Sequence, residues 1–229
     1  MNGAPIPGGP LDFRSLRQIF PGDWIVCFAV KEEAQGFESP DPGVRVLITG
    51  MGRNNAERAL RNAIQQKKPA LVLSCGFAGG LDPALRKGML LCSDDSDARV
   101  AAVLTAGGVR KGKFHCADRV AVTAAEKRTL RESTGADAVE MESHPLCALS
   151  SREGIPSGTL RVVLDTSDED LPLDFNQLMK ADCQMDFKKL ALTLVKSPGK
   201  IKALLRLQKE SRAAADSLGQ ILRRLAVSE

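Results

Sequence analysis

The chain of 229 residues contains 43% hydrophobic and 26% charged side chains, a balance typical of a globular protein with one sizeable core. Its net charge of +4, the absence of tyrosine and the single tryptophan argue against a nucleic-acid binder, which needs a strongly basic surface and usually aromatic platforms. No apolar run is long enough to cross a membrane. The N-terminus also lacks the basic start and apolar centre of a secretory signal, so we expect a cytoplasmic protein.

The cysteines and histidines indicate neither disulfides nor a metal site. The six cysteines form no CxxC pair, and most lie in apolar runs, which favours buried free thiols. The two histidines are too few and too poorly placed for a zinc site. We therefore expect no metal and no cofactor.

In chain order, residues 1–22 predict an irregular N-terminal arm rich in proline and glycine, and residues 23–229 predict a single domain. Apolar runs predict strands at 23–30, 44–50, 70–76, 88–93, 136–142 and 159–165. Helices are predicted at 54–67, 123–133, 143–153 and beyond Pro172, with a break at Pro198 and Gly199. Asn54 and Thr123 each precede an acid by three residues, the pattern of a capping box. Residues 98–107 fit either a helix or a strand, and residues 113–121 are predicted to be extended.

Strands alternate with helices along most of the domain, and the strands are apolar on both faces. This pattern indicates an α/β fold in which helices cover both faces of a sheet.

Three of the predicted strand ends carry residues suited to a site, because ligands bind at the carboxyl ends of strands in such sheets. Lys31, Glu32 and Glu33 follow the first strand, and a glycine-rich stretch at 76–80 follows the third. The segments VEMES (139–143) and RVVLD (161–165) each place carboxylates at the end of a strand. Each feature also has a structural explanation, because acids favour helix starts and glycines form turns.

Taken together, these segments resemble the nucleoside phosphorylase and methylthioadenosine/S-adenosylhomocysteine nucleosidase superfamily over about residues 24–195. The resemblance rests on AVKEE, GMG (50–52), CGFAGGL, VEMES and GIPSGTLRVVLD, in that order. It implies a three-layer α/β/α sandwich around a twisted mixed sheet, and an enzyme that cleaves the bond between ribose and a purine base. DLPLDFNQLMK and SPGKIKALLRLQKESRAAA are similar to the hopanoid-associated branch, for which removal of adenine from adenosylhopane is the proposed activity.

The resemblance also implies roles for individual residues. Asp165 would assist protonation of the departing purine, and Glu33, or Glu32 after a one-residue slip, would activate the attacking water. Glu142 would bind the ribose hydroxyls while Met141 packs against the ribose. Further contacts with the base and the reaction centre fall on Phe77, Ala78, Gly79 and Val120.

Acids at the place where phosphorylases bind phosphate favour hydrolysis, although Arg45 and Arg53 keep a phosphate-dependent phosphorylase as the alternative. Two positions depart from the family pattern. Leu164 replaces a serine before the aspartate, and Val120 replaces a phenylalanine that stacks on the purine. A non-catalytic relative that binds nucleosides is therefore the second alternative.

The C-terminal segment predicts an amphipathic helix, with Leu218, Ile221 and Leu222 on its apolar face and many lysines and arginines on the other. The simplest interpretation is a helix packed on the domain with a solvated basic face. A peripheral contact with an anionic membrane is the more specific hypothesis. The family resemblance also implies a homo-oligomer.

Overall fold

The computed structural model describes residues 16–180, 189, 192 and 199–227. Its strands are β1 (Trp24–Phe28), β2 (Val44–Ile48), β3 (Leu71–Gly80), β4 (Leu90–Ser93), β5 (Arg110–Gly112), β6 (Phe114–Cys116), β7 (Ala138–Glu140) and β8 (Ser157–Asp165). Its helices are α1 (Leu16–Ile19), α2 (Lys31–Ala34), α3 (Arg53–Gln66), α4 (Ala98–Ala106), α5 (Ala124–Thr134), α6 (Ser143–Arg152), α7 (Phe175–Leu178) and α9 (Lys200–Ala226).

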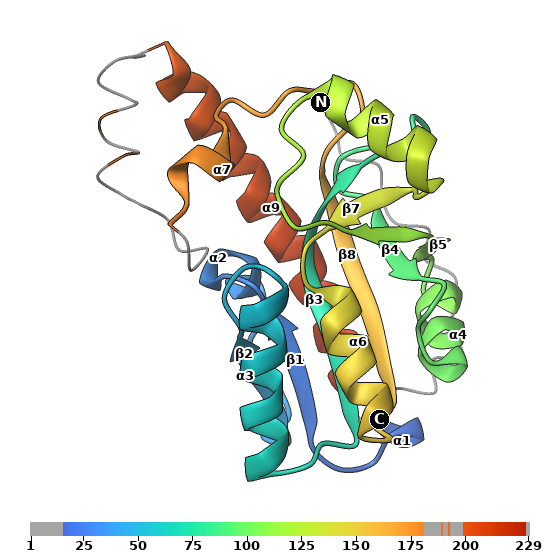
Figure 1. Cartoon of the computed structure of the whole chain (residues 1–229). Coiled ribbons are helices and arrows are strands. Elements are labelled where there is room, and N and C mark those ends of the chain that lie inside the picture. Colours follow the sequence, from blue (N-terminus) through green and yellow to red (C-terminus); the bar gives the residue numbers. More distant parts are fainter. Residues whose placement is uncertain (1–15, 181–188, 190–191, 193–198, 228–229) are drawn as a thin grey trace.

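The strands form one mixed sheet in the order β2-β1-β3-β8-β4-β5, with β7 beside the end of β3 and β6 beside β7. β2, β1, β3 and β8 are parallel, whereas β4 is antiparallel to β8 and β7 is antiparallel to β3. Figure 1 shows α3 and α6 in front of the sheet and α9 passing behind it. The three-layer α/β/α sandwich around a mixed sheet is confirmed.

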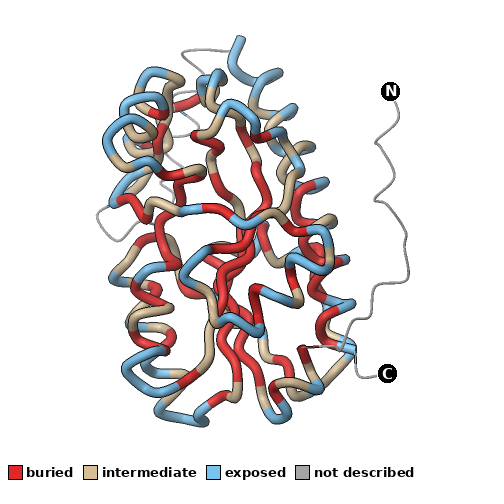
Figure 2. Tube along the Cα trace, turned by 90° about the vertical axis from the view of Figure 1, so that its right-hand side faces the viewer, coloured by how far each residue is buried: buried red, intermediate tan, exposed pale blue. Residues whose placement is uncertain are grey.

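The two sheet faces have separate cores because successive side chains of a strand point to opposite faces. Trp24, Val26 and Phe28 of β1 pack with α1, α4 and α9, whereas Ile25 and Cys27 pack with α3 and α6. The central strands are accordingly buried along most of their length (Figure 2). This explains why their sequences are continuous apolar runs.

The outer elements differ from the sequence prediction in several places. Within the arm predicted to be irregular, residues 16–19 form α1, and Leu16 is buried in the core; residues 1–15 lie outside the described part of the chain. The ambiguous stretch at 98–107 is helix α4, and of the segment predicted to be extended at 113–121 only Phe114–Cys116 is a strand. The capping box at Thr123 is confirmed, with Glu126 as the reciprocal acceptor.

The predicted capping box at Asn54 is wrong. The N-cap of α3 is Gly52, whose φ of 83° is in the region that favours glycine. The carboxylate at this helix start comes from a distant part of the chain, because the Gly52 amide donates to Glu142 Oε1 at 2.8 Å. A hydrogen bond to a residue so far along the chain leaves no local pattern.

α9 is held against the sheet by a backbone contact with the segment that follows α2. A Cβ atom on Gly219 would lie 1.8 Å from the carbonyl oxygen of Gly36, and one on Gly36 would lie 2.0 Å from that of Ala215. Only glycine permits this approach. The contact therefore fixes the position of α9 relative to the turn that carries Glu33.

The described cysteines have free thiols, and all but the half-buried Cys147 are buried, as expected; Cys183 lies outside the described residues. None of the described helices is long and apolar enough to cross a membrane.

Candidate active site

A large cavity lies at the carboxyl ends of β1, β2, β3 and β8, where the topology brings the parallel strands to one edge. Its volume is about 1060 Å³, at the upper end of the range of about 300–1,000 Å³ usual for small-molecule sites. All the site residues predicted from the sequence line it: Glu33, Phe77, Ala78, Gly79, Val120, Met141, Glu142 and Asp165.

The register of the sheet explains why these residues meet. Gly79 of β3 pairs with Asp165 of β8 on one side and with Val139 of β7 on the other. Asp165 therefore lies beside one edge of β3, while β7 leads into Met141 and Glu142 at the other edge. Residues more than 20 positions apart in the chain thus converge across one strand.

The glycine-rich stretch is part of β3 and not a loop, and its glycines make room for protein groups. A Cβ on Gly76, whose φ is +149°, would lie 2.5 Å from Glu33 Oε1. A Cβ on Gly79 would lie 3.3 Å from Asp165 Oδ2, and one on Gly80 would lie 3.2 Å from the Asp165 carbonyl oxygen. These glycines therefore leave room for the acidic residues of the site.

Glu33 is held by backbone amides at the end of β1. Its Oε2 accepts from the amides of Ala29 at 2.9 Å and Val30 at 3.4 Å, and its Oε1 accepts from that of Phe77 at 2.8 Å. Burial raises the pKa of Glu33, while Arg161 and these amides oppose the shift. The neighbouring Glu32 also lines the cavity but is exposed, so Glu33 is the better fixed of the two acids.

Glu142 lies close to a buried arginine that sequence analysis had noted only as part of a motif. Arg161 is 1% exposed, and its Nη2 donates to Glu140 Oε2 at 2.7 Å and to Ser74 Oγ at 3.0 Å. Its Nη2 is 3.9 Å from Glu142 Oε2, while Nε and Nη1 are buried without a hydrogen-bond partner.

The pKa values of the two acids nearest Arg161, Glu140 and Glu142, are shifted in opposite directions. Burial opposes ionisation of Glu140, but the adjacent Arg161 holds its pKa below the usual range. Burial raises the pKa of Glu142 to about 7, with Arg161 opposing the shift and Glu140 and Glu33 adding to it. Glu140 therefore favours its ionised form, whereas the pKa of Glu142 lies near neutral pH.

Asp165 forms an ion pair with Lys127 of α5, a residue that sequence analysis did not single out. Burial raises the pKa of Asp165, and the ammonium of Lys127 opposes the shift. Lys127 itself is fully buried. Its position in an amphipathic helix beside Glu126 gave no sign of this burial.

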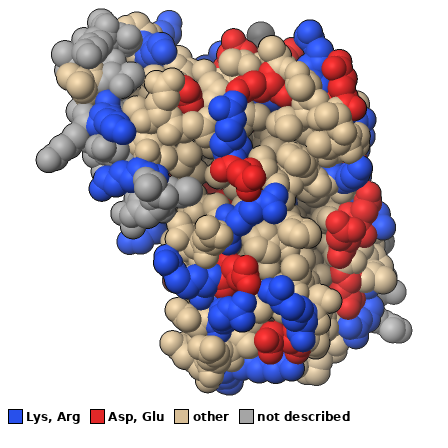
Figure 3. Space-filling model, viewed as in Figure 1, with Lys and Arg blue, Asp and Glu red and all other residues tan. Residues whose placement is uncertain are grey.

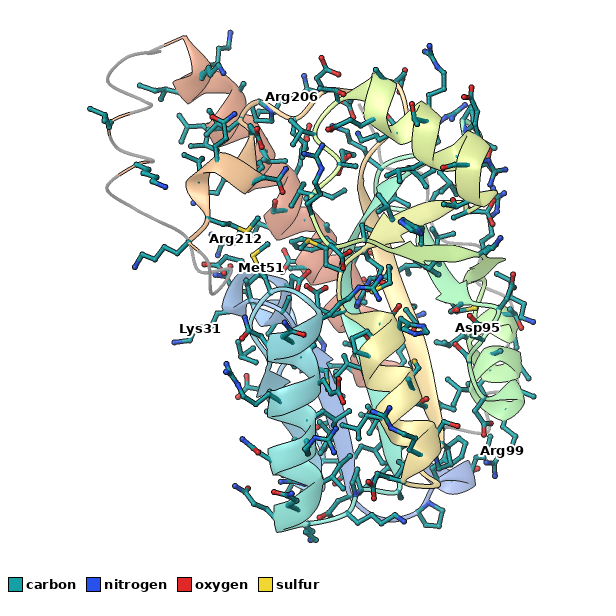
Figure 4. All side chains as sticks on the ribbon, in the orientation of Figure 1. Lys31, Met51, Asp95, Arg99, Arg206 and Arg212 are labelled. Atoms are coloured by element: carbon teal, nitrogen blue, oxygen red, sulfur yellow. The ribbon has the colours of Figure 1, made fainter. Side chains whose placement is uncertain are left out.

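The outer wall of the cavity is apolar and comes from the segment around Val120, the end of β8 and the chain beyond it. Val120 is held there by Asn176 of α7, which accepts from its amide and donates to its carbonyl at 2.9 Å each. The apolar lining of this wall consists of Leu164, Leu171, Phe175, Met179, Leu204, Leu205 and Leu207. The position of the cavity can be followed in Figure 4 from two labelled residues that line it, Met51 and Lys31 of α2.

The two arginines that supported phosphorolysis do not line the cavity. Arg45 is at the opposite end of its strand, where it donates to the Lys67 carbonyl at 3.3 Å. Arg53 forms an ion pair with Asp118 at 2.8 Å. Within the described residues, no group of three or more His, Cys, Asp or Glu side chains is placed to hold a metal ion.

The fold is a mixed α/β sandwich, and acidic side chains line the cavity at its strand ends. This arrangement is typical of domains that bind or convert a small molecule. The sequence model of the Phosphorylase superfamily matches residues 40–108 and 98–196, which is more than half of the chain. The chain therefore belongs to the phosphorylase superfamily. No curated protein sequence matches it.

Solved structures share the fold at low sequence identity. A mutant methylthioadenosine/S-adenosylhomocysteine nucleosidase of Helicobacter pylori with 5′-methylthioadenosine in its active site is 16% identical, with a TM-score of 0.59 over 88% of this chain and 98% of that chain. Futalosine hydrolase of the same organism is 17% identical, with a TM-score of 0.58 over 90% and 98%. The S-adenosylhomocysteine nucleosidase of Streptococcus pyogenes is 14% identical, with a TM-score of 0.60 over 90% and 99%.

Proposed function

We propose that this protein is an N-ribosyl hydrolase that releases a purine, adenine, from a 5′-substituted nucleoside. The observation that carries the proposal is the convergence of Glu33, Glu142 and Asp165, all buried, on one cavity. Cleavage of a nucleoside needs an acid for the leaving base, a stabiliser for the positive ribose and a base for water. The nucleosidases and the futalosine hydrolase that share the fold agree with this chemistry.

Asp165 is the proposed acid. A purine leaves more readily when its ring nitrogen takes a proton, and burial of Asp165 favours the protonated carboxyl that can deliver it. Such proton transfer typically contributes about 10²–10⁴-fold to a rate.

Glu142 is the proposed partner of the ribose. An ionised carboxylate at this position accepts hydrogen bonds from sugar hydroxyls and stabilises the oxocarbenium-like sugar as the base departs. The Gly52 amide fixes its Oε1, and Met141 beside it provides an apolar surface in the same cavity.

Glu33 is the proposed base. Three backbone amides orient its carboxylate, and Oε1 accepts only one of these bonds, from Phe77. A carboxylate oxygen has two acceptor positions, so Oε1 keeps one for the attacking water.

Water is the favoured nucleophile because the charges oppose phosphate binding. Glu33, Glu140 and Glu142 surround the guanidinium of Arg161, so acidic groups outnumber cations in this buried cluster. Phosphate sites instead use an excess of cations and backbone amides. Phosphorolysis remains the second candidate, because Arg161 Nε and Nη1 are without a protein partner.

The apolar outer wall supports a bulky apolar 5′-substituent. The cavity of about 1060 Å³ exceeds what an unsubstituted nucleoside fills, and leucines of α9 line part of the remainder. Adenosylhopane, whose substituent is a large hydrocarbon, is the substrate that we propose on these grounds.

We also propose that the protein is cytoplasmic and contacts an anionic membrane, where such a lipid substrate would lie. The beginning of α9 supports this contact. Lys200, Lys202, Arg206, Lys209 and Arg212 belong to the first half of α9. Separate Lys and Arg side chains are visible at the upper left of Figure 3, and Ile201 and Leu205 are 43% and 60% exposed. Basic side chains beside exposed apolar ones are typical of helices that bind anionic lipid surfaces. The variant Lys202→Glu/Lys209→Glu should lose co-sedimentation with phosphatidylglycerol vesicles, whereas Lys68→Glu/Lys111→Glu should retain it. Equal binding by both variants would contradict the proposal.

Exposed apolar side chains on an edge strand support our proposal that the protein forms a homo-oligomer. β2 ends the sheet, and its Val46 and Ile48 are 42% and 38% exposed. Exposed apolar side chains on an edge strand are commonly covered by a second copy. Light scattering should show an assembly that Val46→Glu dissociates, and a monomeric wild type would contradict the proposal.

The test of the activity is release of adenine from 5′-substituted adenosines, followed by chromatography. We expect turnover by the wild-type protein. Binding of the nucleoside, measured by calorimetry, without release after long incubation would instead identify a non-catalytic nucleoside-binding relative.

A further inference from the structure

Lys127 is an unusual residue for the interior of a protein. It lies in the first turns of α5, and its side chain is 0% exposed. Lysine is almost never fully buried unless its charge is paired. The groups that pair with the Lys127 ammonium therefore indicate why this side chain is buried.

The Lys127 ammonium contacts three oxygen atoms of the segment that ends β8 and follows it. Nζ donates to the carbonyl oxygens of Thr166 and Glu169, both at 2.7 Å, and forms an ion pair with Asp165 Oδ2. An ammonium has three protons and no acceptor. Lys127 thus joins α5 to the segment that follows β8 and to the proposed acid itself.

The contact also distinguishes the two oxygens of Asp165. Oδ2 is shielded from solvent and faces the Lys127 ammonium, while the residue lines the cavity. Because Oδ2 forms the ion pair with Lys127, the carboxylic proton belongs on Oδ1, the oxygen left for the cavity.

We propose that Lys127 is a positioning residue for Asp165, which it orients with Oδ1 toward the substrate and whose carboxylate it stabilises after proton transfer. This inference rests on the proposed function. In the step, the O–H bond at Oδ1 breaks and an N–H bond forms on the purine. The electron pair stays on the Asp165 carboxylate, and Lys127 keeps all its protons. The neighbouring ammonium makes Asp165 a stronger acid than burial alone would allow.

Other charged groups near Asp165 are already paired with one another. Glu169 disfavours and Lys87 favours its ionised form. However, Lys87 binds Glu169 and Glu210, both at 2.8 Å. Lys127 is the cation in direct contact with the Asp165 carboxylate, and it lowers the pKa of Asp165 more than Lys87 does.

The test is a titration of ¹³C-labelled aspartate by NMR in the wild-type protein and in Lys127→Met, with Asp165→Asn to assign the signal. The pKa of Asp165 should rise by about one unit or more in Lys127→Met, the usual effect of losing an adjacent opposite charge. Lys87→Met is the matched control and should cause a smaller rise. If Lys127→Met does not fold, Lys127→Gln removes the charge but keeps a donor for one of the carbonyls.

The alkaline limb of the pH profile of kcat/KM for adenine release should move in the same direction. An unchanged Asp165 titration overturns the inference, and so does a uniform loss of rate with no shift of the limb, which would show a merely structural role. A shifted titration in a protein that releases no base overturns the proposed function, and the control of Asp165 by Lys127 stands.

Discussion

Replacing Glu142 with glutamine tests whether this residue stabilises the ribose in its ionised form. Glutamine keeps the shape of the side chain and an oxygen that accepts from the Gly52 amide, but it carries no charge. The pKa of Glu142 is raised to about 7 by burial. The ionised fraction is therefore about one tenth at pH 6 and about nine tenths at pH 8.

If ionised Glu142 is the active form, kcat/KM of the wild-type protein should rise about tenfold between pH 6 and pH 8. Glu142→Gln should abolish this rise and lower kcat/KM at pH 8 by about 10²-fold or more, the usual cost of a lost electrostatic stabiliser. The assay is the initial rate of adenine release over this pH range, with thermal unfolding measured in parallel.

Glu32→Gln is the matched control because Glu32 lines the same cavity but is exposed. It should keep the tenfold rise. If the rise persists in Glu142→Gln, the titrating group is another residue and the role assigned to Glu142 is wrong.

Three further changes test other parts of the account. Asp165→Asn should abolish base release while nucleoside binding by calorimetry persists, since an amide has no carboxylic proton to give; wild-type turnover would remove Asp165 as the acid. Glu33→Gln should slow release by about 10²-fold, more than Glu32→Gln, and a smaller effect than that of Glu32→Gln would reverse the assignment. Gly219→Ala should lower the free energy of unfolding by about 1–3 kcal/mol, because its Cβ would overlap the Gly36 carbonyl oxygen. Gly199→Ala, where a Cβ meets nothing within 4 Å, should unfold like the wild type in the same denaturant titration.

The sequence predicted the parts of the fold that depend on local patterns. Apolar runs located β1, β3 and β8, and the side-chain pairing of Thr123 with Glu126 marked the start of α5. Glu33 and Asp165 converge because their parallel strands share one edge, and this also followed from the order of elements. Glu142 instead reaches the site from β7, which is antiparallel to β3.

Features that depend on contacts between distant residues could not be predicted. The amide of Gly52, the N-cap of α3, donates to Glu142, and Glu33 fills the space that a Cβ on Gly76 would occupy. The sequence pattern indicates that Lys127 is a solvated helix residue. Its burial depends on contacts with the segment that follows β8. The contribution of α9 to the cavity wall likewise depends on its packing against Gly36.

The central claim is that water, and not phosphate, takes the place of the purine. The most direct measurement is mass spectrometry of the sugar product formed in ¹⁸O-labelled water, with and without phosphate in the buffer. The account predicts release of adenine without phosphate and a free sugar that carries one heavy oxygen at C1. A strict requirement for phosphate, with a sugar 1-phosphate as product, would contradict it.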